Sequence, residues 1–211
     1  MKFLAFEGID ASGKSTLIQN LSKTLENLHI SYIQTREPGG TLLGDELRQF
    51  LLRKEGEAPC PRAEVLLYQV IRAQHVEKKI GPHLKQGDWV LCDRFTASSL
   101  AFQSGGRGIS EEDIKWLNHF STGGLQPDLW VLLDLPVEAA FQRLSKRQKT
   151  LGQEPDRFES EKTDFHQRVR ASYLKQAHEE PEKWLVLDAL KSPEQLHQEL
   201  VHFLKEKQWL P

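Results

Sequence analysis

The sequence predicts an α/β protein with a five-stranded parallel sheet covered by helices on both faces. Short apolar runs alternate with amphipathic helical stretches, which is typical of a sheet that is buried on both sides. A glycine-rich loop follows the first run, and three later runs end beside an aspartate, at the edge where such sheets bind ligands. We expect one domain, residues 1–211, because this length suits a single core and no repeat or low-complexity linker divides it.

The individual elements follow from the apolar runs and from helix start signals. Ser110 and Ser192 each precede acidic first-turn residues and mark helix starts. The expected strands are Lys2–Glu7, Ser31–Thr35, Trp89–Cys92, Leu129–Leu133 and Trp184–Leu187. The expected helices are Lys14–Leu28, Leu42–Arg53, Ala63–Lys79, Glu111–Phe120, Val137–Arg147, Phe158–Ala177 and Pro193–Lys205. The candidate binding loops, which are glycine-rich or polar, are Glu37–Thr41, Gly105–Gly108 and Lys149–Asp156.

Composition excludes several classes of partner. The formal net charge of −2 gives no global attraction to nucleic acid or to an anionic membrane. No apolar stretch reaches the roughly 18–20 residues of a membrane span, and acidic Glu7 interrupts the start that a signal peptide would need. Cys60 and Cys92 suggest no disulfide framework. We therefore expect a cytoplasmic protein with neither nucleic-acid nor membrane partners.

The segment Gly8–Ser15 fits the phosphate-binding motif G-x-x-x-x-G-K-[ST], between an apolar run and a helical stretch. Its glycines let backbone N–H groups turn toward an anion, and the following helix N-terminus adds partial positive charge. Lys14 can reach the β- and γ-phosphates, and the Ser15 hydroxyl can bind Mg²⁺. The residues expected to contact the nucleoside triphosphate are Gly8, Ile9, Asp10, Ala11, Ser12, Gly13, Lys14, Ser15 and Thr16.

Two further strand ends carry residues suited to phosphoryl transfer. Arg36 precedes a Pro-Gly-Gly turn, which offers a fixed cation and exposed N–H groups to a second phosphate. Asp93 and Arg94 end another apolar run, where the carboxylate can hold Mg²⁺ directly or through water and the guanidinium can bind a phosphoryl group. A simple pairing of Asp93 with Arg94 is the structural alternative. Glu37 suits a structural role in its turn equally well, so we leave it out of the catalytic set.

Three longer strings resemble the thymidylate kinase family in its bacterial type. They are Asp93–Gln103 (DRFTASSLAFQ), Arg36–Thr41 (REPGGT) and Ala63–Tyr68 with Arg72–His75 (AEVLLY and RAQH). The resemblance covers nearly the whole chain. It implies the three-layer fold of P-loop NTPases and an enzyme that transfers the γ-phosphoryl group of ATP to dTMP. The products are dTDP and ADP, and the reaction requires Mg²⁺.

The resemblance also implies the roles of individual acceptor-site residues. One helix face can present Tyr68 and Arg72 together, since they are four residues apart. The implied contacts are Asp10 with the deoxyribose 3′-hydroxyl, Arg36, Arg48 and Arg94 with the monophosphate, Tyr68 stacked on thymine, Arg72 with a base oxygen, and Ser99 and Gln103 with the rest of the base. A homodimer is implied too, with helices Ala63–Lys79 and Ser98–Gln103 as contributors to the interface.

A basic lid at about residues 143–158 is the last feature that the resemblance implies. One type of the family carries an arginine inside the phosphate-binding loop, whereas residues 9–12 here contain none. Phosphoryl transfer depends on charge stabilisation more than on acid–base chemistry, so the cations must come from elsewhere. We expect Arg147 and Arg157, with Arg143 as a third candidate, to close over ATP. A solvated helix face is the alternative explanation for this basic run.

Departures from the family pattern leave the acceptor base open. Ala11 and Ser104 each stand where the family commonly has Gly. Tyr68 replaces a usual Phe, Phe102 replaces a Tyr, and Phe95 replaces Tyr or His. A kinase for another pyrimidine monophosphate, such as dUMP, is therefore the nearest alternative. A non-catalytic ATP-binding module is a second one, although Lys14, Asp93 and the lid arginines are all retained. Three arginines assigned to an acceptor phosphate argue against a kinase of free nucleosides.

Overall fold

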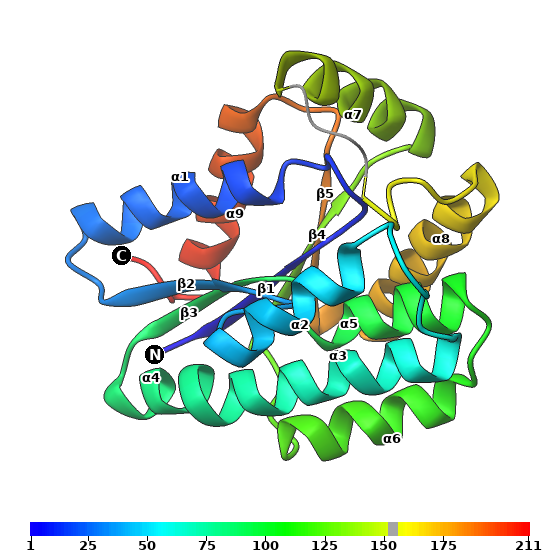
Figure 1. Cartoon of the computed structure of the whole chain (residues 1–211). Helices are drawn as coiled ribbons and strands as arrows, with labels where there is room; N and C mark the ends of the chain where they lie inside the picture. The colour runs from blue at the N-terminus through cyan, green and yellow to red at the C-terminus, as the bar shows by residue number, and fades with distance from the viewer. Residues whose placement is uncertain (152–155) are drawn as a thin grey trace.

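The computed structural model describes residues 1–151 and 156–211 and contains a five-stranded parallel sheet (Figure 1). The strand order is β2-β3-β1-β4-β5. The strands are β1 (Phe3–Glu7), β2 (Tyr32–Arg36), β3 (Trp89–Asp93), β4 (Leu129–Asp134) and β5 (Trp184–Asp188). The fold class and all five expected strands are confirmed. Each aspartate expected beside a strand end is the last residue of its strand.

Helices occupy the connections between these strands. The α-helices are α1 (Lys14–Asn27), α2 (Leu42–Leu52), α3 (Pro61–His75), α4 (Gly81–Gln86), α5 (Thr96–Ser99), α6 (Glu111–Thr122), α7 (Val137–Leu151), α8 (Thr163–Glu179) and α9 (Pro193–Glu206). The described part of the chain also has π-helical stretches at Val76–Ile80 and Leu100–Gly106 and a short 3₁₀ turn at Pro181–Lys183. Ser110 and Ser192 cap α6 and α9 as expected, each accepting a bond from a first-turn N–H group.

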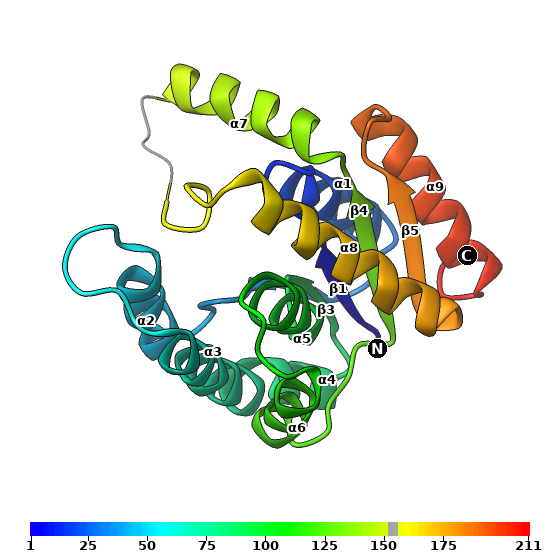
Figure 2. The ribbon, with the colours of Figure 1, turned by 90° about the vertical axis from the view of Figure 1, so that its right-hand side faces the viewer.

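The helices form the outer layers of a three-layer arrangement. Helices α1 and α9 pack together on one face of the sheet, and α4, α5 and α8 cover the other (Figures 1 and 2). Helices α3 and α6 lie further out and pack against each other. Because every strand is parallel, all five carboxyl ends meet at one edge of the sheet, which is where the phosphate-binding loop leaves β1.

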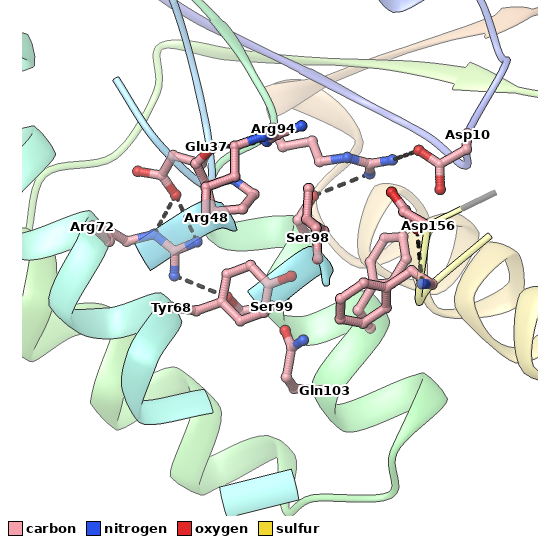
Figure 3. A pocket seen from close by; sticks show the side chains of 14 residues that line it. Asp10, Glu37, Arg48, Tyr68, Arg72, Arg94, Ser98, Ser99, Gln103 and Asp156 are labelled. Atoms are coloured by element: carbon pink, nitrogen blue, oxygen red, sulfur yellow. Dashed lines mark hydrogen bonds and ion pairs between the residues drawn. The ribbon is translucent and has the colours of Figure 1, made fainter. Parts of the chain in front are cut away.

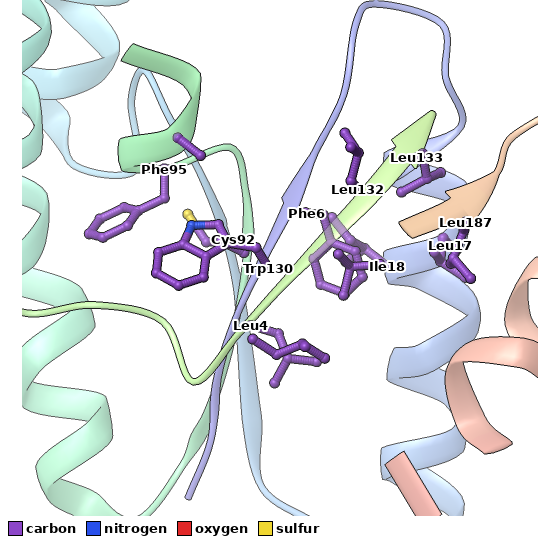
Figure 4. Close-up of a cluster of buried hydrophobic side chains, with 14 of the residues drawn as sticks. Leu4, Phe6, Leu17, Ile18, Cys92, Phe95, Trp130, Leu132, Leu133 and Leu187 are labelled. Carbon is purple, nitrogen blue, oxygen red and sulfur yellow. The ribbon is translucent and has the colours of Figure 1, made fainter. Parts of the chain in front are cut away.

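Apolar side chains fill both spaces between the sheet and its helices. Leu4 and Phe6 of β1 face Leu17 and Ile18 of α1, as Figure 4 shows. On the opposite face, Phe3 meets Phe95 edge-to-face with ring centroids 5.0 Å apart. Alternate side chains along a strand point to opposite faces of the sheet, so each central strand contributes to both cores. This explains why the central strands contain almost only apolar residues.

Three expected helices differ from the structure by several residues, and one of them, expected to end at Arg147, runs on to Leu151 in α7. The helix expected over Ala63–Lys79 is interrupted, because α3 ends at His75 and passes through the π-helical stretch into α4. The helix expected from Phe158 begins only at Thr163, since residues 156–161 form turns in which Asp156 accepts the N–H bonds of Phe158 and Glu159.

The expected binding loop Gly105–Gly108 is a further correction. Gly105 and Gly106 belong to the π-helical stretch Leu100–Gly106, which packs closely on α8. A Cβ atom on Gly106 would lie 2.4 Å from a ring carbon of Phe165, so glycine here permits close helix packing. Of the expected loop Lys149–Asp156, residues 152–155 lie outside the described residues. Within the described ranges, no helix combines the length and apolar character needed to cross a bilayer.

Truncating a side chain in the central sheet should be costly. Leu91 of β3 is fully buried, so Leu91→Ala should lower the free energy of unfolding by about 2–5 kcal/mol. Urea denaturation would measure the change. Leu190→Ala is the matched control, because Leu190 is 59% exposed and its loss should cost less than about 0.5 kcal/mol. Equal losses in the two variants would contradict this description of the core.

Candidate active site

The phosphate-binding loop joins β1 to α1 with the backbone turned toward the sheet edge. Gly13 has a left-handed backbone (φ 103°), and Ala11 has φ 59° where glycine would adopt this conformation more easily. Lys14 donates from Nζ to the carbonyls of Gly8 and Ile9, each at 3.1 Å. Burial and the neighbouring Arg94 lower the pKa of Lys14. Within the described chain, no side chain caps the first turn of α1, which leaves its N–H groups available to an anion.

Ser15 and Asp93 form a pair beside this loop. The Ser15 hydroxyl donates to Asp93 Oδ2 at 3.3 Å. The pair is close because β1 and β3 are neighbours in the sheet, with Phe6 opposite Asp93. One carboxylate and one hydroxyl suit Mg²⁺, which takes few protein ligands and completes its shell with water and phosphate oxygens. In residues 1–151 and 156–211, no three His, Cys, Asp or Glu residues gather as a metal cage.

A cleft of about 510 Å³ extends over the loop. Its walls include Lys14, Ser15 and Asp93 together with several arginines, which are Arg36, Arg48, Arg94, Arg143 and Arg147. Arg143 and Arg147 lie one turn apart on α7. Arg143 donates to the Ala189 carbonyl at 2.8 Å, and Arg147 pairs with Glu159. Carboxylates line the same cleft, namely Asp10, Glu37, Asp93, Asp156 and Glu159, so its cations stand in an ordered mixture of charges where a triphosphate would lie.

A second pocket lies beside the cleft, toward α3 and α5 (Figure 3). It is lined by most of the residues expected at the acceptor site, namely Asp10, Arg48, Tyr68, Arg72, Arg94, Ser99 and Gln103. Burial raises the pKa of Tyr68. Asp10, Arg48 and Arg94 also line the larger cleft. Glu37 and Asp156 line both cavities as well, so the two cavities meet along a wall of five residues.

Arg94 occupies the junction of the cavities. Its backbone is left-handed (φ 71°), which turns the side chain from the end of β3 toward the loop. The guanidinium donates to the Gly8 carbonyl and to Asp10 Oδ1, each at 2.8 Å. Burial alone would lower the pKa of Arg94, but Asp10, Tyr173 and the nearby carboxylates raise it. Arg94 is thus a fixed, permanently charged cation.

A buried carboxylate that the sequence did not reveal supports Arg94. Glu7, fully buried at the end of β1, accepts bonds from Phe95 N (2.8 Å), Ser98 Oγ (2.6 Å) and Tyr173 OH (2.9 Å). Tyr173 in turn accepts a bond from Arg94 Nη1 at 3.1 Å. Burial raises the pKa of Glu7, although these three donors act in the opposite direction.

A second buried network surrounds Arg72, which is only 1% exposed. Its five N–H groups have protein acceptors, which are Glu37, Gln69, Ser99, Asn118 and the Phe95 carbonyl. Glu37 also pairs with His75 Nδ1 at 3.1 Å. Burial alone would raise the pKa of Glu37, but Arg72 and His75 together lower it. Glu37 is therefore a structural anchor for Arg72, one of the two roles that the sequence allowed.

Two expected site residues lie apart from the positions assigned to them. Among the described residues, Arg36 lines the phosphate cleft and not the acceptor pocket, and it pairs with Asp45 at 3.0 Å. Arg157, expected over ATP, instead donates to the Leu51 carbonyl (3.1 Å) and to Glu64 (2.6 Å) on the acceptor side. Part of the expected lid, residues 152–155, lies outside the described residues.

Sequence reasoning missed several residues of the site. Glu7 lies in a strand and Tyr173 in a helix, both with ordinary apolar periodicity. The neighbouring sequence therefore gave no indication that the two side chains form a hydrogen bond. Asp156 and Phe158 line the acceptor pocket, and only their position next to Arg157 hinted at it. Glu64 stands inside the string AEVLLY, but its ion pairs depend on segments far along the chain.

The fold and site together define a P-loop protein with an arginine-lined phosphate cleft and a second pocket for an acceptor. The sequence model of one family, described as thymidylate kinase, matches residues 6–200. Two similar relatives are named thymidylate kinase. The one from Bdellovibrio bacteriovorus is 54% identical over 210 residues, covering 100% of this chain and 98% of the relative. The one from Desulfovibrio desulfuricans is 47% identical over 194 residues, covering 91% and 89%.

A solved structure agrees with these relatives. The crystal structure of thymidylate kinase from Ehrlichia chaffeensis superposes with a TM-score of 0.76 at 29% identity, covering 96% of this chain and 98% of that one. The chain belongs to the thymidylate kinase family. The family, the fold class and the assignment as a nucleotide kinase that the sequence predicted are therefore confirmed.

The Glu37–Arg72 pair should make stability depend on acid pH. Because the pKa of Glu37 in the folded protein lies below its usual 4.5, the carboxylate stabilises the fold above that pH and ceases to do so as pH falls through the lowered pKa. Glu37→Gln should lower the free energy of unfolding by about 3–5 kcal/mol at neutral pH. We would measure urea denaturation of both proteins from pH 7 to about pH 3. The difference in unfolding free energy between the wild-type protein and the variant should become smaller toward pH 3. A difference that stays constant would argue against the ion pair.

Proposed function

We propose that this chain transfers the γ-phosphoryl group of ATP to dTMP, giving dTDP and ADP, in the synthesis of dTTP. The observation that carries the proposal is the shared wall of the two cavities. Asp10, Arg48 and Arg94 border both the phosphate cleft and the acceptor pocket. A phosphoryl group in the cleft and an acceptor phosphate in the pocket would meet there, which is the positioning that direct transfer requires. We infer a cytoplasmic location, and both cysteines are free.

On the donor side, the loop amides and Lys14 would bind the β- and γ-phosphates. Ser15 and Asp93 would hold Mg²⁺, which supplies charge neutralisation at those phosphates. The single domain would close through a lid at about residues 143–158, with Arg143 and Arg147 already lining the cleft. Arg157 remains a candidate for this lid, although reaching ATP would require it to leave Glu64. Closure would exclude the water that otherwise hydrolyses ATP.

On the acceptor side, Arg94 and Arg48 would bind the monophosphate, with Arg36 approaching from the cleft. Asp10 would accept a bond from the 3′-hydroxyl. Tyr68 would stack on the base, as its place in the pocket wall allows (Figure 3). Arg72, Ser99 and Gln103 would form the polar end of the base pocket.

A coupled assay of ADP release tests this function. The purified protein would receive ATP and Mg²⁺ with dTMP, dUMP, dCMP, dAMP, dGMP or thymidine in turn. Clear preference for dTMP would support the proposal. If the protein phosphorylated only a different monophosphate, the kinase chemistry would stand but dTMP would be refuted as the acceptor. A folded, ATP-binding protein without acceptor-dependent turnover would favour the non-catalytic module.

Removing the junction cation should abolish most of the activity. Arg94→Ala deletes a fixed charge at the point of transfer, so kcat should fall at least about 10²-fold, and Lys14→Ala should have a similar effect. Steady-state kinetics and circular dichroism together would separate lost chemistry from lost folding. Arg62→Ala, which removes an exposed arginine at the start of α3, is the control and should leave kcat unchanged. Near-normal turnover in Arg94→Ala would refute the mechanism.

The homodimer expected from the resemblance has a suitable surface. Leu66 and Val70 of α3 are 55% and 49% exposed, and Trp116 and Phe120 of α6 are 65% and 74% exposed. Since α3 and α6 pack together, these side chains form an apolar face that a second copy could cover. The other expected contributor, Ser98–Gln103, is mostly buried within the chain and offers little surface.

Charge on this face should dissociate the dimer. Phe120→Asp should convert a dimer into a monomer in sedimentation-equilibrium experiments, because a carboxylate cannot be buried there without a partner. Leu190→Asp, which changes an exposed leucine after β5, should leave the association unchanged. A monomeric wild-type protein, or a Phe120→Asp variant that remains dimeric, would contradict the proposed interface.

A further inference from the structure

The side-chain amide of Gln103 has a defined orientation in the acceptor pocket. Gln103 is 2% exposed, and its amide points into the pocket (Figure 3). The amide nitrogen donates to Glu64 Oε1 at 3.1 Å. A carboxylate can only accept hydrogen bonds, so the nitrogen must face Glu64. The carbonyl oxygen is then the polar atom that Gln103 can present to a bound base.

Glu64 is held in place by two arginines. It is 1% exposed, and Arg157 Nη2 lies 2.6 Å from its Oε2. Arg107 approaches its Oε1 at 3.4 Å and is itself paired with Glu161. Two guanidinium partners stabilise the carboxylate as an acceptor and oppose its rotation. The orientation of the Gln103 amide is therefore set by Glu64 before a ligand binds, and Arg107 would still hold Glu64 if Arg157 moved toward ATP.

A donor lies in the same pocket wall. Arg72 Nη1 donates to Ser99 Oγ at 2.9 Å, as the dashed line in Figure 3 shows. The Ser99 oxygen accepts from Arg72 with one lone pair, and its hydroxyl hydrogen can be donated to a ligand. The pocket thus presents an acceptor from Gln103 and a donor from Ser99.

We propose that Glu64 is a positioning residue that determines base specificity by fixing the Gln103 amide. The inference rests on the proposed function and concerns its acceptor. Thymine and uracil carry a hydrogen on N3 beside the C4 carbonyl, which complements the acceptor and donor of the pocket. Cytosine carries the reverse arrangement, with an unprotonated N3 beside an amino group. Cytosine would therefore place its N3 acceptor against the fixed Gln103 acceptor, and buried polar groups left unpaired in this way discriminate strongly.

Glu64→Gln tests the inference, because a neutral amide can either donate or accept and so lets Gln103 rotate. We would measure kcat/KM for dTMP, dUMP and dCMP in the wild-type protein and the variant. The ratio of dTMP to dCMP should fall about 10-fold or more. The ratio of dTMP to dUMP should stay constant, since both bases carry the N3 hydrogen. An equal loss of kcat/KM for all three acceptors would show a merely structural role and overturn the inference.

Glu161→Gln is the matched control. It removes the other carboxylate that pairs with Arg107, at a site that does not touch Gln103, so both ratios should stay constant. A fall in the dTMP to dCMP ratio in this control as well would overturn the specific role of Glu64. Glu64→Asp retains an acceptor-only group and should keep the wild-type ratio even if kcat/KM decreases.

Gln103→Met provides a second test, which also applies if Glu64→Gln does not fold. It deletes the carbonyl acceptor at similar volume, so the dTMP to dCMP ratio should fall as it does in Glu64→Gln. The double variant should fall no further, because both changes remove one interaction. An unchanged ratio in Gln103→Met would overturn the inference. Wild-type protein that phosphorylates no pyrimidine monophosphate would refute the proposed function and this inference together, whereas dTMP activity with unchanged ratios refutes only the inference.

Discussion

The carboxylate of Glu7 connects the parts of the molecule that the site requires. It lies at the end of the central strand β1, fully buried, and binds the backbone of Phe95, the hydroxyl of Ser98 and the hydroxyl of Tyr173. These groups come from the segment after β3 and from α8. Burying a carboxylate is costly unless its oxygens are satisfied, and here three donors satisfy them. Ser98 and Tyr173 also accept hydrogen bonds from Arg94. The groups that stabilise buried Glu7 therefore also orient the cation at the junction of the two cavities.

Buried carboxylates also hold two polar side chains of the acceptor pocket. Glu37 holds Arg72, and Glu64 holds Gln103, so two of the polar groups that face the pocket each have a buried carboxylate behind them. Such supports restrict side-chain rotation before any ligand arrives, which lowers the entropy lost on binding. The phosphate cleft is different, because the α7 arginines at its border are held by backbone carbonyls and by the pair of Arg147 with Glu159, and Arg147 is 45% exposed. Rigidity on the acceptor side and adjustable cations on the donor side suit an enzyme that selects a base and then closes over a triphosphate.

Much of this could be predicted from the sequence, for reasons that differ by element. The five strands are continuous apolar runs, and the phosphate-binding loop is a contiguous string, so local patterns were sufficient for both. Apolar periodicity predicted no helix over Thr96–Gly106, because its serines and glycines favour a loop, and only the resemblance implied a helix at Ser98–Gln103. Packing of Gly106 on Phe165 outweighs the loop preference. The bond between Glu7 and Tyr173 joins residues 166 positions apart, and Glu64 meets Arg157 across 93 positions. Pairs at such separations depend on the tertiary fold, and a single sequence carries no signal for them.

In the proposed function, the donor and acceptor phosphates meet at Arg94. A crystal structure with dTMP, Mg²⁺ and a non-hydrolysable ATP analogue tests it most directly. We expect the Arg94 guanidinium to contact the dTMP phosphate at hydrogen-bonding distance while Tyr173 and Ser98 still bind Glu7, with the terminal phosphate of the analogue facing the acceptor oxygen. A complex in which the dTMP phosphate lies away from Arg94, with the arginine still bound to Asp10, would contradict it.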